Sequence, residues 1–97
     1  MTTTDLLKKL TPAILGQIAD EYVRLYTRRV ELGKGGNPRI RIDECENYLR
    51  IWKSIAGRAA VGNLSGFSPE EHVEIGDALD SGEWDYLFEP KPTEVSP

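Results

Sequence analysis

The sequence has few of the side chains on which disulfides, metal centres and nucleophilic active sites depend. Its 97 residues include one cysteine, one methionine and one histidine. A lone Cys45 cannot form a disulfide within the chain or supply a thiolate metal site. No hydrophobic run approaches the ~18 residues of a membrane span, and the polar residues 1–5 are unlike a secretory signal. We therefore expect a soluble, cytoplasmic protein without a cofactor.

The remaining candidates for catalytic chemistry are weak. His72 lies among glutamates in the sequence, and without a second histidine it is expected to be a surface residue, not a metal ligand. Cys45 falls on a hydrophobic stripe and is expected to be buried. The GKGG segment at residues 33–36 has no following Ser or Thr and succeeds a predicted helix, so it does not match a phosphate-binding loop. An enzyme is not expected.

Length and composition predict one small domain. Hydrophobic residues make up 39% of the sequence, and no internal repeat is visible. A chain of this size buries about 65% of its unfolded surface, which suffices for a core without disulfides. The domain is expected to span residues 1–88. Residues 89–97 hold three of the six prolines and are expected to form a flexible tail.

Hydrophobic spacing and capping residues predict an all-α fold. The first long helix is expected to begin after Thr11, with Pro12 at its first position, and to end at Gly33. The second is expected to begin at Asp43, which forms a D-x-x-E capping box with Glu46. Both carry hydrophobic residues at spacings of three and four. Because a short loop joins these two helices, we expect them to fold back on each other as a long antiparallel hairpin.

A third, shorter helix is predicted next. Ser68, Pro69 and Glu71 combine an N-cap, a proline at the first helical position and a capping-box glutamate. Asp80 to Gly82 ends this helix, and residues 83–88 are expected to add one more helical turn.

The predicted hairpin register has two consequences. Placing Leu32 opposite Glu44 sets Gly16 and Gly57 near the open end, where glycines suggest that the helix backbones approach closely. Four aromatic residues lie nearer the loop: Tyr22, Tyr26, Tyr48 and Trp52. This is more aromatic surface than one short helix covers, so self-association through the hairpin is one expectation.

The net charge of −4 hides a strongly uneven distribution. Residues 1–68 contain 11 basic and 7 acidic side chains, a net charge of +4. Residues 69–97 contain 1 basic and 9 acidic side chains, a net charge of −8. The basic part gathers at the loop end of the hairpin, in Arg24, Arg28, Arg29, Lys34, Arg39 and Arg41. These cations either complement the helix dipole or bind an anion, since arginine suits forked contacts with carboxylates and phosphates.

The acidic third of the chain is the other candidate binding surface. Its acidic residues are Glu70, Glu71, Glu74, Asp77, Asp80, Glu83 and Asp85. Trp84, Leu87 and Phe88 would share one face of a helical turn among them. Either this turn packs back on the hairpin core, or it anchors a partner while the acids steer it towards a basic groove.

Three functions remain open from the sequence. The first is a non-enzymatic interaction protein that engages a basic surface of a partner, such as a nucleic-acid-handling protein, through the acidic third. Such a protein would be a small inhibitor or regulator, as phages and mobile elements carry. The second is a structural subunit that forms a homo-oligomer by head-to-tail charge matching. The third is a module that binds a nucleotide or nucleic acid at the arginines, although the sequence pI of about 5.0 argues against nucleic acid.

Overall fold

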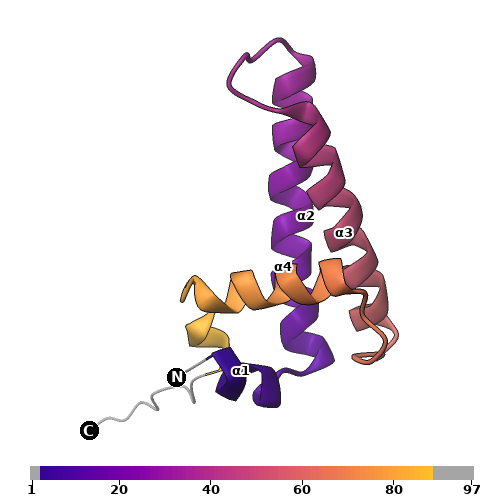
Figure 1. Cartoon of the computed structure of the whole chain (residues 1–97), viewed down its shortest axis with the longest axis vertical. Helices are drawn as coiled ribbons and strands as arrows, with labels where there is room; N and C mark the ends of the chain where they lie inside the picture. The colour runs from indigo at the N-terminus through magenta and orange to yellow at the C-terminus, as the bar shows by residue number, and fades with distance from the viewer. Residues whose placement is uncertain (1–2, 89–97) are drawn as a thin grey trace, which may run out of the picture.

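The computed structural model describes residues 3–88, and every regular element among them is helical (Figure 1). The elements are α1 (Thr3–Lys9), α2 (Pro12–Lys34), α3 (Ile42–Ala60), α4 (Pro69–Asp80) and the 3₁₀ turn η1 (Asp85–Leu87). The predicted all-α class, the long hairpin and the third helix are therefore confirmed. The predicted flexible tail, residues 89–97, lies outside the described residues.

Helices α2 and α3 form the antiparallel hairpin. The ring of Tyr22 stacks on that of Trp52 with 4.4 Å between centroids, and Tyr26 stacks on Tyr48 at 5.4 Å. These pairs place the observed register within two residues of the predicted one. Gly16 also faces Ala59, since a Cβ built on this glycine would lie 3.9 Å from the Ala59 Cβ.

Tight packing against a glycine occurs at a different position from the one predicted. A Cβ built on Gly57 would meet no atom within 4 Å, so the close approach predicted there is wrong. At Gly33, by contrast, it would lie 2.6 Å from Cγ1 of Ile42 and 3.0 Å from Cγ2 of Ile40. The returning loop thus packs directly on the α2 backbone. Gly33 is buried within α2, which continues to Lys34, and does not end the helix as predicted.

The predicted capping box at Asp43 is also wrong. Helix α3 begins at Ile42, and its N-cap is Arg41, which makes no side-chain capping hydrogen bond. The Arg41 guanidinium instead donates to Glu44 at 2.9 Å. Packing of Ile42 on Gly33 accounts for the early start, because it fixes the chain direction one residue before Asp43.

Helix α1 was not predicted from the sequence. It is only seven residues long and buries one large side chain, Leu6, which is 2% exposed and belongs to the core. Helix α1 contacts α4. Its seven residues are too few to form a stable helix alone, so packing against the rest of the protein stabilises it.

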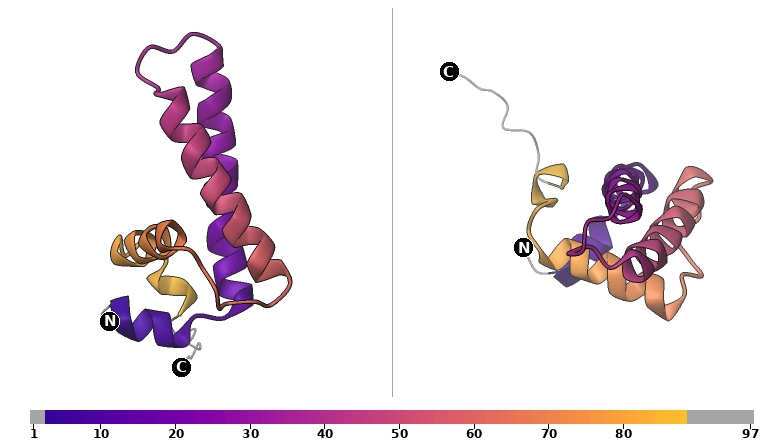
Figure 2. Two further views of the ribbon diagram at one scale, coloured as in Figure 1. Left: turned by 45° about the vertical axis from the view of Figure 1, so that its right-hand side comes forward. Right: turned by 90° about the horizontal axis from the view of Figure 1, so that it is seen from above.

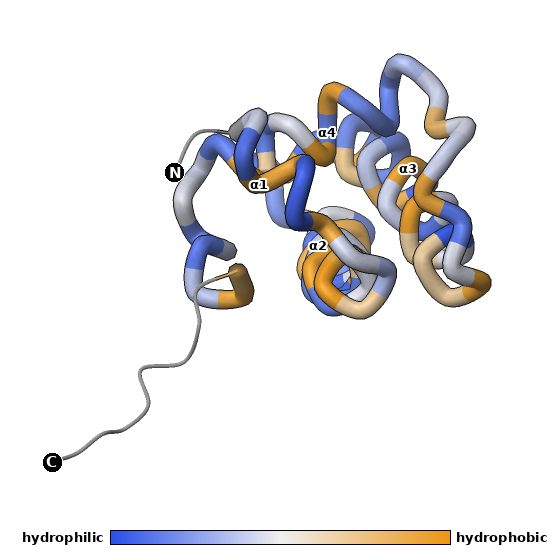
Figure 3. The backbone as a smooth tube through the Cα atoms, turned by 90° about the horizontal axis from the view of Figure 1, so that it is seen from below, coloured by the Kyte–Doolittle hydropathy of each residue, from blue (hydrophilic) through white to orange (hydrophobic). Residues whose placement is uncertain are grey.

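The core lies at the open end of the hairpin and collects one face of each helix. Its buried residues are Leu6, Leu15, Ile18, Ala19, Ile51, Trp52, Ile55, Ala59, Ile75, Ala78 and Leu79. Hydrophobic positions alternate with hydrophilic ones along the helices, as an amphipathic arrangement requires (Figure 3).

Helix α4 lies across the hairpin and leaves its loop end protruding (Figures 1 and 2). The chain extends 52 Å along its longest axis and 23 Å along its shortest. Among the described residues, none of the helices is long and apolar enough to cross a membrane.

Candidate functional site

The start of α4 is fixed by the capping box predicted there. The Ser68 hydroxyl accepts a hydrogen bond from the Glu71 amide at 3.2 Å, and the Glu71 carboxylate accepts one from the Ser68 amide at 2.7 Å. Pro69 occupies the first helical position. The predicted helix start is confirmed.

Glu71 also joins α4 to α3, which corrects its predicted place on the acidic surface. Glu71 is 5% exposed and accepts a hydrogen bond from the Ser54 hydroxyl at 2.6 Å. The Arg58 Nε lies 3.8 Å from the same carboxylate. Burial by itself raises the pKa of Glu71, but the hydrogen bonds from Ser54 and Ser68 and the charge of Arg58 lower it below its ordinary value of 4.5. Its role is structural.

The other predicted acidic residues are at least partly accessible. Glu70 forms an ion pair with Arg50 at 2.9 Å. Asp77, Asp80 and Glu83 are exposed, and Glu74 and Asp85 are half-buried. For Glu74 and Asp77, no ion pair with another described residue is found, so their charge is directed to solvent or to a ligand.

A row of stacked aromatic rings runs along the hairpin next to these two carboxylates. Tyr22 lies between Trp52, at 4.4 Å, and Tyr26, at 6.2 Å, and Tyr26 in turn stacks on Tyr48. Trp52 is buried, whereas the three tyrosines are half-buried. The hairpin supplies both sides of this row, so its position depends on the register of α2 and α3.

The row and α4 together border an open pocket of about 270 Å³, which we call the α4 cavity. Its lining residues are Tyr22, Tyr26, Tyr48, Trp52, Glu74, Asp77 and Ala78. The aromatic residues of the hairpin and the acidic residues of α4, which were predicted separately from the sequence, come together at this cavity.

The α4 cavity is lined by two carboxylates and by no basic side chain. Burial raises the pKa of Glu74, and the neighbouring Asp77 raises it further, although the Trp52 indole N–H lowers it. Burial and the charge of Glu74 also raise the pKa of Tyr26. The Trp52 Nε1 is buried and has no acceptor in hydrogen-bonding geometry, so it faces Glu74 without a full hydrogen bond.

The predicted aromatic anchor packs against the core. Trp84, Leu87 and Phe88 are half-buried on the hydrophobic core, and the Trp84 indole N–H donates to the Tyr22 hydroxyl at 3.3 Å. The structure therefore supports the interpretation in which this turn closes the hairpin. Asp85 is in the η1 turn itself.

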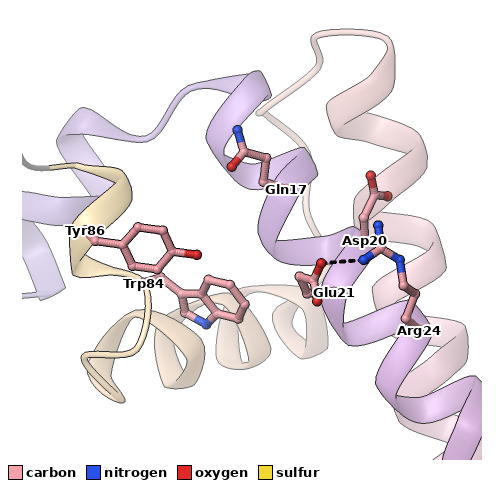
Figure 4. A pocket seen from close by; sticks show the side chains of 6 residues that line it. All are labelled: Gln17, Asp20, Glu21, Arg24, Trp84 and Tyr86. Atoms are coloured by element: carbon pink, nitrogen blue, oxygen red, sulfur yellow. Dashed lines mark hydrogen bonds and ion pairs between the residues drawn. The ribbon is translucent and has the colours of Figure 1, made fainter. Parts of the chain in front are cut away.

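A second recess lies between this turn and α2 (Figure 4). It has a volume of about 380 Å³ and is lined by Gln17, Asp20, Glu21, Arg24, Trp84 and Tyr86. Its arginine already forms an ion pair with Glu21. One of the two carboxylates of this recess is thus paired with a cation, whereas the α4 cavity is lined by two carboxylates and no cation.

The six predicted anion-binding cations do not form one patch. Arg24 and Arg28 share a shallow surface on α2 with Glu31. Lys34 faces Glu46 of α3 at 3.9 Å. The remaining three, Arg29, Arg39 and Arg41, line a separate cavity of about 490 Å³, which we call the arginine cavity.

Aromatic rings also reach the arginine cavity, which the loop sequence did not indicate. Tyr26 and Tyr48 line it, and the Arg29 guanidinium lies 5.8 Å from the centre of the Tyr26 ring. Cys45 is buried in its wall, as predicted from its place on the hydrophobic stripe. The sequence signal for this arrangement is limited to the i, i+3 spacing of Tyr26 and Arg29 on α2, because the other two arginines of this cavity precede α3 in the loop.

His72 is exposed, as predicted, and its ring contacts Phe67 edge-on. Within residues 3–88, no group of three or more His, Cys, Asp or Glu side chains could hold a metal ion. Comparisons with protein-family models, with curated proteins and with solved structures found no match.

Proposed function

We propose that this chain is a non-enzymatic interaction module, a small inhibitor or regulator that engages a basic surface of a partner protein through α4. The observation that carries the proposal is the pairing of two carboxylates, Glu74 and Asp77, with a preformed aromatic wall. No cation of the described residues neutralises them. Aromatic residues contribute most of the energy of many interfaces, and unpaired surface charge steers a complementary partner.

The rigidity of α4 supports the same function. The capping box and the Ser54 hydrogen bond hold α4 on α3, and the Glu70–Arg50 ion pair adds a contact at its first turn. A binding surface on a fixed helix loses little conformational entropy when a partner docks.

Affinity purification with a charge-reversed variant tests the proposal. Glu70→Lys, Glu74→Lys and Asp77→Lys change the accessible face of α4 and leave the buried Glu71 intact. We expect the partner captured by the wild type to be lost, and the purified complex to weaken as salt rises. Capture by a folded triple variant at the wild-type level would contradict the proposal.

A matched control reverses three acidic residues elsewhere on the hairpin: Asp20→Lys, Glu31→Lys and Glu46→Lys. This variant has the same net charge as the α4 variant, so a loss of binding confined to α4 separates a specific surface from total charge. Sedimentation of the wild type at low and high salt identifies head-to-tail self-assembly, which would make the captured partner a second copy of the chain.

The arginine cavity favours a second candidate function, binding of a phosphate-bearing ligand. Arg29 and Arg39 line it without an ion pair to another described residue, beside the rings of Tyr26 and Tyr48. Titration with ATP tests this candidate. Affinity is expected to fall with salt and to be lost in an Arg29→Gln, Arg39→Gln variant, and an unchanged affinity would exclude it.

A further inference from the structure

The α4 cavity has the features of a pocket for one planar cation. Its walls come from α2 and α3 through the stacked rings, and its rim comes from α4 through Glu74 and Asp77. These two residues are three positions apart in the sequence and therefore lie on the same face of the helix. The cavity, of about 270 Å³, has room for the end of one side chain.

The acceptors in the α4 cavity outnumber the donors that the chain provides for them. An ionised carboxylate offers about four lone-pair sites, and the only donor noted near Glu74 among the described residues is the Trp52 indole N–H. Trp52 is 1% exposed, so its ring is fixed by packing, and its buried N–H finds no acceptor in hydrogen-bonding geometry. The lone pairs of Glu74 therefore stay open to a ligand.

The aromatic wall is already assembled without a ligand. Tyr22 is held between Trp52 and the Trp84 indole, which donates to its hydroxyl at 3.3 Å. Tyr26 is held by stacking on Tyr48 at 5.4 Å. A preformed wall of this kind binds a ligand with little reorganisation.

The same chain already places guanidinium groups in cation–π contact with its own aromatic rings. Arg58 lies 5.7 Å from the centre of the Phe67 ring, and Arg29 lies 5.8 Å from that of Tyr26. A guanidinium offers five N–H donors in one plane and combines stacking with forked hydrogen bonds to carboxylates. A quaternary ammonium offers no donors to Glu74 and Asp77, and a lysine ammonium lacks the planar face.

We infer that the α4 cavity binds the guanidinium group of an arginine side chain presented by the partner protein. The aromatic row receives the flat face or edge of the group, and Glu74 and Asp77 accept its hydrogen bonds. This inference rests on the proposed function and specifies which group of the partner is recognised.

Titration of the ¹⁵N-labelled full chain with N-acetyl-arginine amide tests the inference by NMR. The Trp52 indole N–H signal is the reporter, and a Trp84→Phe variant distinguishes it from the second indole. We expect this signal to shift in a saturable manner. The neutral isostere N-acetyl-citrulline amide is expected to leave it unmoved, because the positive charge is absent.

A cavity variant and a matched control locate the site. Glu74→Gln with Asp77→Asn is expected to weaken binding of N-acetyl-arginine amide by about ten- to a hundredfold, since charge-assisted hydrogen bonds are lost. Asp20→Asn with Glu31→Gln removes the same charge from α2 and is expected to bind as the wild type does. Thermal melting confirms that both variants are folded.

Three outcomes would overturn the inference. The first is an unmoved Trp52 signal, and the second is an equal shift with the citrulline compound. The third is equally tight binding of N-acetyl-lysine amide, which would show that planarity is not recognised. Each of these results would leave the proposed function to be decided separately, because that depends on partner capture by the charge-reversed α4 variant and not on the free amino-acid amide.

Discussion

Trp84 donates its indole N–H to the hydroxyl of Tyr22, 62 residues earlier in the chain, at a distance of 3.3 Å. Their rings meet edge to face with centroids 5.6 Å apart. This contact ties the C-terminal turn to the middle of α2. It also holds Tyr22 in the wall of the α4 cavity, so the last described turn contributes to the candidate site without lining it.

Removing this contact is expected to destabilise the fold. Trp84→Ala should lower the free energy of unfolding by about 2 kcal/mol, because a half-buried ring is lost from the core. Tyr22→Phe keeps the ring and removes the acceptor, at a cost of about 1 kcal/mol. Urea unfolding of both single variants and of the double variant measures the coupling. Strictly additive effects would mean that the hydrogen bond contributes nothing.

Two glycines of the hairpin are expected to respond in opposite directions to alanine. In Gly33→Ala, the new Cβ would lie 2.6 Å from Ile42 Cγ1, and the required shift of the loop should cost about 1–3 kcal/mol. Gly57→Ala meets open space in the interior of α3, so the alanine should stabilise the protein by about 0.5–1 kcal/mol. Thermal melting of the two variants compares them directly. A stabilised Gly33→Ala protein would refute the close packing of Ile42 on α2.

Glu71 is expected to make the protein sensitive to acid. Because its pKa is lower in the folded state, the carboxylate stabilises the fold above the unfolded pKa, and this contribution is lost as pH falls through the folded pKa. Glu71→Gln should cost about 1–2 kcal/mol at neutral pH and weaken the fall in stability on acidification. The exposed neighbour Glu70→Gln is the control and should cost less than about 1 kcal/mol. Equal effects of the two substitutions would contradict a structural role for Glu71.

Glu74 is expected to behave in the opposite way. The pKa of Glu74 is raised in the folded state, so folding favours its protonated form. This contribution to the free energy of unfolding is fully present below the unfolded pKa and is lost as pH rises through the folded pKa. Glu74→Gln should therefore raise the urea midpoint at neutral pH, and the difference should vanish at acid pH. A residue that reduces stability while it borders a cavity fits a binding role. A lower midpoint at neutral pH would show that the carboxylate stabilises the fold.

The helices were predictable wherever local capping and hydrophobic period agreed. Ser68, Pro69 and Glu71 define the start of α4 by contacts within one turn, and this prediction is confirmed. The start of α3 was misplaced because packing of Ile42 on Gly33 outweighs the local capping preference of Asp43. Helix α1 was missed because it is stabilised by burial of Leu6 and not by its own short sequence.

The residues of the candidate site were visible in the sequence, but their grouping was not. Periodicity identified Tyr22 and Trp52 as hairpin residues, and composition identified Glu74 as part of an acidic segment. The capping box distinguishes Glu71 at the start of α4, but no local pattern shows that Glu74 faces the aromatic row. The crossing of α4 over the hairpin decides that Glu71 meets Ser54 of α3 while Glu74, three residues later, lines the cavity.

The all-α hairpin, its third helix and the division of charge at residue 68 follow from the sequence, because helix period, capping and charge are local or additive properties. The crossing of α4 over the hairpin, with Glu71 inward and Glu74 beside the rings, follows instead from packing between helices. This packing likewise separates the arginines into different surfaces. Which side chains meet across helices depends on the register and crossing of α2, α3 and α4, and these are set by long-range packing at Gly33, Trp52 and Leu6.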